Sequence, residues 1–165
     1  MLTWKRISLV VSLCLLTTPA VGLANDKILE FETMAGVVRP FTGPANAIRG
    51  VPGGGLPWTV AEAEGELRTD GRIEVRVRGL VLAEGPRAGT NPITAFKAIV
   101  SCLTATTDAA GNLAVATVNR STNTFPATAT GDSIIEDVVS LPAPCIAPIV
   151  FVTSPTGAWF SATGF

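Results

Sequence analysis

Cysteines are the residues of this chain with the most direct chemistry, because two thiols in an oxidising compartment join as a disulfide. Of the three, Cys14 lies in an apolar run near the amino terminus, which leaves Cys102 and Cys145 as an even pair. A bond between them would close a loop of about 43 residues and restrict the unfolded chain by about 4 kcal/mol in the chain-entropy model. Two thiolates do not fill a tetrahedral zinc site, and the sequence has no histidine to complete one. We therefore expect a disulfide between Cys102 and Cys145.

Nucleophilic catalysis needs a base beside the nucleophile, and without histidine neither a Ser-His-Asp nor a Cys-His arrangement can be built. A Ser-Lys pair is the remaining arrangement, but Lys27 and Lys97 do not lie in a Ser-x-x-Lys pattern. Asp70, Asp108 and Asp132 are isolated turn aspartates and do not form the alternating acids of a calcium loop. We assign no catalytic residue, no metal and no cofactor, and we lean against an enzyme.

Charged residues alternate along the segment 59–82, whose two halves meet at Asp70-Gly71. Asp-Gly between two alternating runs predicts a β-hairpin. The apolar face of the second strand carries Ile73, Val75 and Val77. On the outer face, the second strand carries Glu74, Arg76 and Arg78, which lie across from Glu62, Glu64 and Glu66 on the first strand. Such a ladder is typical of a solvated sheet face, where each charge pair stabilises the fold by tenths of a kcal/mol. A general acid, in contrast, needs a carboxyl group with a raised pKa in a cleft. We therefore keep a carboxylate-dependent hydrolase acting on an envelope polymer only as the alternative function.

The segment 36–57 is too rich in Gly and Pro for a regular ladder and too long for an ordinary connection. Loops of this kind on a rigid scaffold often carry binding residues. The candidate binding residues are Arg39 and Arg49, as forked donors for an anion, and Phe41 and Trp58, as stacking surface. Backbone amides at 53–55 would add an anion-binding concavity. The competing interpretation is a structural wrap that tucks the aromatic residues into the core.

The remaining elements that must position these residues are short and β-rich. The pattern predicts strands at 28–34, 93–106, 113–118, 146–153 and 158–163. In the strand at 93–106, Phe96 and Cys102 share one face and Lys97 points outward, so we expect one solvated face there. The segment 133–142 fits either a capped helical turn or a strand, and its neighbours favour the strand. The sequence thus predicts an all-β fold, an antiparallel β-sandwich of about eight short strands with one long Gly/Pro-rich loop.

The amino terminus has the form of a secretory signal peptide. Lys5 and Arg6 precede an apolar run over residues 7–16, and Gly22-Leu23-Ala24 ends the segment with small residues. A membrane anchor is the alternative, but this run is shorter than the roughly 20 apolar residues that a spanning helix needs. We expect residues 1–24 to be cleaved as a signal peptide and residues 25–165 to form a single β-sandwich domain.

Composition narrows the classes of partner. With 15% charged residues and a net charge of −1, the chain lacks the basic surface that nucleic-acid binding requires. With 47% hydrophobic residues, it is a folded protein rather than a disordered one. We expect no nucleic-acid partner and no membrane span once the signal is removed.

Three segments resemble a group of uncharacterised small secreted bacterial proteins: NAIRGVPGGGLPW (46–58), GTNPITAFKAIVSCLT (89–104) and PCIAPIVFVTSPTGAWFSATG (144–164). The resemblance covers most of the mature chain and implies a secreted bacterial protein. It brings no activity, cofactor or catalytic residue with it.

These observations together predict an exported, non-enzymatic binding or structural protein of the bacterial envelope or extracellular space. The partner is not specified by the sequence, and an envelope protein or polymer is the class that we expect. Two carboxyl groups within about 5 to 10 Å in a cleft would favour the hydrolase. A flat apolar patch beside the long loop would favour binding.

Overall fold

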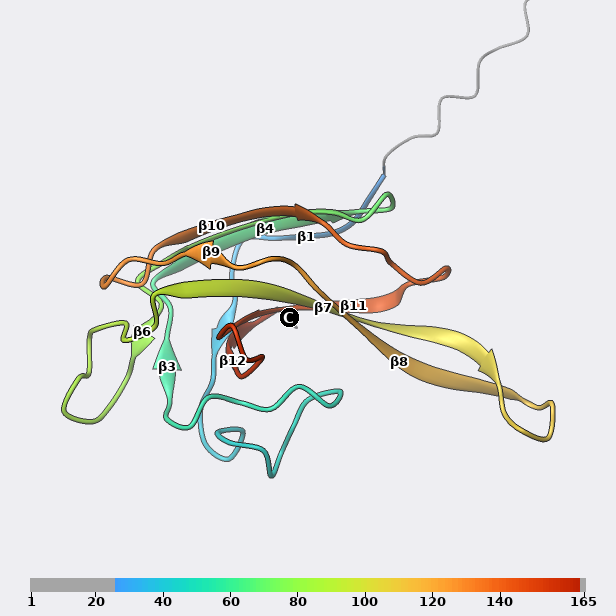
Figure 1. Ribbon diagram of the computed structural model, residues 1–165, viewed down its shortest axis with the longest axis horizontal. Helices are drawn as coiled ribbons and strands as arrows, with labels where there is room; N and C mark the ends of the chain where they lie inside the picture. Colours follow the sequence, from blue (N-terminus) through green and yellow to red (C-terminus); the bar gives the residue numbers. More distant parts are fainter. Residues whose placement is uncertain (1–25, 164–165) are drawn as a thin grey trace, which may run out of the picture.

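Two antiparallel β-sheets pack face to face around one core in the computed structural model, which describes residues 26–163 (Figure 1). The strands are β1 (Lys27–Phe31), β2 (Ala35–Gly36), β3 (Trp58–Thr59), β4 (Glu62–Arg68), β5 (Arg72–Arg78), β6 (Val81–Leu82), β7 (Ala95–Thr107), β8 (Leu113–Ser121), β9 (Phe125–Pro126), β10 (Ser133–Val138), β11 (Ile146–Thr153) and β12 (Trp159–Ala162). The first sheet has the order β1-β4-β5-β10, and the second has the order β2-β12-β11-β7-β8, with β9 paired to β7. Strands β3 and β6 pair with each other in a separate two-stranded sheet. The all-β sandwich expected from the sequence is confirmed.

The β4–β5 hairpin has the predicted turn and the predicted faces. Ile73, Val75 and Val77 are buried, at 3%, 0% and 1% exposure. The register places Glu62 opposite Arg78 and Glu64 opposite Arg76, as the alternation predicted. The ambiguous segment after residue 132 is strand β10, which pairs with β5 along its whole length.

The cysteine-bearing strand β7 is buried on both faces at its centre, which differs from the one wet face that its sequence predicts. On the inner face Phe96 and Cys102 are fully buried, as expected. On the opposite face, however, Ile99 is only 7% exposed and Ser101 is 0% exposed. The expectation of a solvated outer face is therefore wrong here, because another part of the chain covers it.

That cover is the long Gly/Pro-rich loop, which runs along the outer side of the second sheet (Figure 1). The amide of Val37 donates to the carbonyl of Phe160 at 2.8 Å, and the amide of Gly54 donates to that of Trp159 at 2.8 Å. At Gly53 a Cβ atom would overlap the carbonyl oxygen of Phe41, so only glycine lets the loop fold back this closely. The loop thus forms a partial third layer over the sheet.

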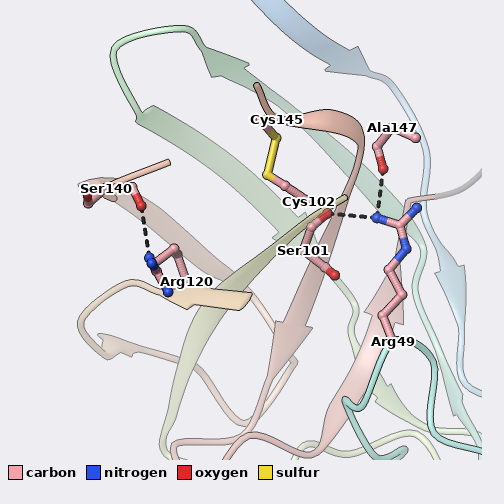
Figure 2. Close-up of a disulfide and its surroundings, with 7 residues drawn as sticks. All are labelled: Arg49, Ser101, Cys102, Arg120, Ser140, Cys145 and Ala147. Carbon is pink, nitrogen blue, oxygen red and sulfur yellow. Dashed lines mark hydrogen bonds between the residues drawn. A yellow bond between two sulfur atoms is a disulfide. The ribbon is translucent and has the colours of Figure 1, made fainter. Parts of the chain in front are cut away.

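The predicted disulfide is present. Cys102 on β7 is bonded to Cys145, directly before β11, with a Cα–Cα distance of 5.0 Å. The bond joins two segments that are 43 residues apart in the sequence (Figure 2), next to Leu103, where the pairing of β11 with β7 ends.

The expected signal peptide, residues 1–24, lies outside the described residues. Between residues 26 and 163 there is no helix with the length and apolar character needed to cross a membrane.

Candidate functional site

The β7–β8 hairpin extends beyond the rest of the sandwich and ends in a free turn (Figure 1). Strand β11 pairs with β7 only as far out as Leu103, whereas β8 pairs with β7 out to Thr107. We call residues 103–117 the arm. At its tip, the carboxylate of Asp108 accepts the amides of Ala110 and Asn112, both at 2.9 Å, which closes the turn. The arm is therefore a two-stranded ribbon with a well-ordered turn and no third strand beside it.

One face of the arm carries a stripe of apolar side chains, interrupted by Thr107, which lies opposite Leu113, and by Thr117, which lies opposite Leu103. Directly opposite residues in an antiparallel pair point to the same face, and the register pairs Val115 with Ala105. Leu103 is paired with Ile146 on β11, so these two side chains share that face as well. We define the stripe as Leu103, Ala105, Leu113, Val115 and Ile146. Leu113 is 83% exposed, Val115 is 71% exposed and Ile146 is 50% exposed, which leaves the stripe open to solvent.

The long loop covers this face of β7 only up to Ser101, next to the first stripe residue, Leu103. Arg49 is the loop residue that binds at this point (Figure 2). Its Nη1 atom donates to the carbonyl of Ser101 at 3.0 Å and to that of Ala147 at 2.8 Å. The β7–β11 ladder is interrupted here by a bulge, and Pro148 has no N–H to donate. Arg49 therefore binds two backbone carbonyls at the bulge and ties the long loop to both strands.

Further contacts brace the root of the arm. Asn119 on β8 donates its side-chain amide to the carbonyl of Arg49 at 3.0 Å. On the other face, Nε of Arg120 donates to the carbonyl of Ser140 at 3.0 Å, beside the disulfide (Figure 2). The arm thus projects from a rigid base.

Trp58, expected as stacking surface for a ligand, is instead part of the core. It is 3% exposed and stacks on Phe160, with ring centroids 3.9 Å apart and an interplanar angle of 21°. Phe160 in turn meets Phe96 edge-on at 5.8 Å. The binding role predicted for Trp58 is wrong for this structure, because no face of its ring is open.

The other three predicted binding residues do not converge on one site. Arg39 is ion-paired with Glu84, with one hydrogen bond of 3.0 Å, and this bond holds the pKa of Glu84 below its usual range. Phe41 is 40% exposed. Arg49 uses its Nη1 atom to bind the carbonyls of Ser101 and Ala147 at the root of the arm, which fixes its guanidinium there, away from the other two residues' contacts.

The anion-binding concavity expected at the loop glycines is also occupied by the protein itself. The amide of Gly53 donates to the carbonyl of Gly43 at 3.1 Å, and the amide of Gly54 donates to the carbonyl of Trp159. These amides tie the loop to itself and to the sheet. They are not directed at solvent.

The charged face of the first sheet contains a concavity lined by carboxylates, which is the kind of site that a carboxylate-dependent hydrolase would use. It has a volume of about 340 Å³, and its lining includes Glu32, Glu62, Glu64, Arg76 and Arg78. Arg78 pairs with Glu62 at 3.2 Å, and Arg76 pairs along its own strand with Glu74 at 2.7 Å. In the same ladder, a hydrogen bond from Lys27 lowers the pKa of Glu66, which is opposite to what a general acid requires. The face therefore has the character of an ion-pair ladder.

The turn aspartates serve as acceptors for backbone amides. The amide of Asn112 lowers the pKa of Asp108, and the amide of Gly79, at 3.0 Å, lowers that of Asp132. Across residues 26–163, no three His, Cys, Asp or Glu side chains are grouped so as to hold a metal ion.

Comparisons with models of known protein families, with curated proteins and with solved structures found no match to this chain. The stripe was not predicted from the sequence, although the low charge of this segment is a signal for it. Between residues 98 and 131 the only charged residues are Asp108 and Arg120, an unusual stretch for a strand pair at a sheet edge.

Proposed function

We propose that this chain is an exported, non-enzymatic binding or structural protein of the bacterial envelope or extracellular space. It acts by contact through the apolar stripe of the arm. The observation that carries the proposal is the exposure of Leu113, Val115 and Ile146 on one face of the arm.

Contiguous apolar surface is unusual on a protein that works alone in water, and a patch of this kind marks an interaction site. The stripe is a flat apolar patch beside the long loop, which is the feature that favours binding over hydrolysis. The disulfide and the hydrogen bonds of Arg49 and Asn119 do not touch a partner in this proposal. They hold the arm in one orientation, which lowers the entropy lost on binding.

Export is supported by the signal-like residues 1–24 and by a disulfide, which is compatible with an extracellular or periplasmic protein. Amino-terminal sequencing of secreted material should begin at Asn25. Recovery of a chain that retains Met1 would contradict export by this route.

The test of contact is capture from the envelope fraction of the producing cells by the immobilised mature protein. Val115→Asp places a charge in the stripe and should abolish specific capture. Val138→Asp is the matched control, because Val138 is 62% exposed but lies on β10 in the other sheet. Capture that is equal for the wild type and both variants would exclude the stripe as the contact surface.

A further inference from the structure

We propose that the stripe is a self-association surface, on which two copies of this chain pack face to face with their arms antiparallel. The inference rests on the proposed function, because it names the partner of the same stripe. A two-fold axis through the middle of the stripe would place the tip of each arm over the root of the other.

The first argument is the distribution of exposure along the stripe. Leu113 and Val115 are the two most exposed large hydrophobic side chains of residues 26–163, and both lie in the outer half of the arm. Ile146, half exposed, lies at the root. An antiparallel crossing covers Leu113 and Val115 of one copy with Leu103 and Ile146 at the root of the other.

The second argument is charge. The tip of the arm carries Asp108, whose pKa is lowered by the turn amides, so it is ionised at neutral pH. The root on the stripe face carries Arg49, whose two carbonyl bonds both come from Nη1 of a guanidinium with five N–H donors. Antiparallel arms bring each Asp108 to an Arg49 of the other copy, whereas parallel arms would bring like charges together. The charges on this face are therefore complementary between two copies only when the arms are antiparallel.

The third argument is that the stripe has no layer of protein packed on it. The long loop covers the outer side of β7 as far as the hydrogen bond between Arg49 and Ser101, and from Leu103 to the tip that side is exposed to solvent. A two-stranded ribbon is marginal in water without something packed on its apolar face. A second copy would continue the layer that the loop begins.

The size of the face sets the expected affinity. The seven steps from Ser101 to Asp108 span roughly 23 Å at about 3.3 Å per residue. Because the ribbon is only two strands wide, the dimer would bury less than about 1,000 Å² in total, which is small for a specific interface. We therefore expect a weak dimer that depends on concentration in the micromolar range.

Strand β8 is also the open edge of its sheet, so edge-to-edge pairing is the competing arrangement. Antiparallel edge pairing keeps opposite residues on the same side of the joined sheet. It would leave Leu113 and Val115 of both copies exposed on that side. Face-to-face packing covers them, and the observed exposure therefore favours it.

Sedimentation equilibrium of the mature protein over a wide range of concentration tests self-association. The wild type should convert from monomer to dimer, Val115→Asp should weaken the dimer at least tenfold, and Val138→Asp should leave it unchanged. Asp108→Asn keeps an acceptor for the turn amides and should weaken the dimer several-fold while reducing its dependence on salt. Circular dichroism spectra that match the wild type establish that each variant is folded.

A monomer at all concentrations, or a dimer that Val115→Asp does not weaken, would overturn the proposal. A wild type that stays monomeric while Val115→Asp abolishes envelope capture would leave the proposed function standing without self-association. A stripe-dependent dimer with no specific envelope capture would support self-association and count against the envelope contact.

The orientation has its own test. Single variants Leu113→Cys and Ile146→Cys, mixed and treated with an added oxidant, should form the mixed intermolecular disulfide. Leu113→Cys alone should form little, because antiparallel arms keep the two tips apart. Preferential linkage of Leu113→Cys to itself would contradict the antiparallel arrangement.

Discussion

Replacing Trp58 by alanine should lower the stability of the protein severely, because the structure places this side chain in the core and not at a ligand. Trp58 is 3% exposed and stacked on Phe160 at 3.9 Å. Truncating a buried aromatic residue costs about 3 to 5 kcal/mol, through lost apolar burial and the cavity that remains. For a domain of this size, that loss corresponds to a fall in melting temperature of about 10 to 15 °C.

The assay is urea unfolding followed by circular dichroism, with Phe41→Ala as the control. Phe41 belongs to the same loop and was predicted for the same role, but it is 40% exposed, so its truncation should cost less than half as much. Binding to any partner found by envelope capture is measured in parallel on folded protein. A loss below about 1 kcal/mol for Trp58→Ala would refute its place in the core and restore it as a binding residue.

Three further outcomes are expected. Alkylation of the denatured mature protein without reductant should leave Cys102 and Cys145 unmodified, and reduction should destabilise the fold by about 4 kcal/mol; two alkylated thiols at the outset would exclude the bond. Arg49→Ala should destabilise by about 1 to 3 kcal/mol in urea unfolding, because a buried carbonyl loses its donor, and an unchanged midpoint would contradict that role. Asp132→Asn should destabilise at pH 7, where the wild-type carboxylate accepts the amide of Gly79. The folded pKa of Asp132 is lowered, so this difference should be complete above about pH 4 and disappear as the pH falls through the folded value; a difference independent of pH would refute the charged interaction.

The sheet elements were predictable because their signals are local. The Asp70-Gly71 turn and the alternation on either side of it determine the register of the β4–β5 hairpin without reference to any distant contact. The disulfide followed from the even pair of cysteines that remains once Cys14 is assigned to the expected signal peptide.

The outcome at the long loop was not predictable, because it depends on contacts between segments far apart in the chain. Trp58 has the same sequence context whether it faces a ligand or Phe160, and only the packing of β12 against the loop decides between them. Arg49 likewise reads as a free cation, whereas its partners are the carbonyls of Ser101 and Ala147, 52 and 98 residues away. The stripe was missed for a related reason: Ile146 joins it only through its pairing with Leu103.

The central claim, contact through the bare face of the arm, is tested most directly by site-specific photo-cross-linking in the producing cells. A photoreactive benzoylphenylalanine at Val115 should give a discrete cross-linked product, whose mass identifies either a second copy or an envelope component. The same group at Val138, similarly exposed on the other sheet, should give none. Absence of a product from Val115, or the same products from both positions, would contradict the account.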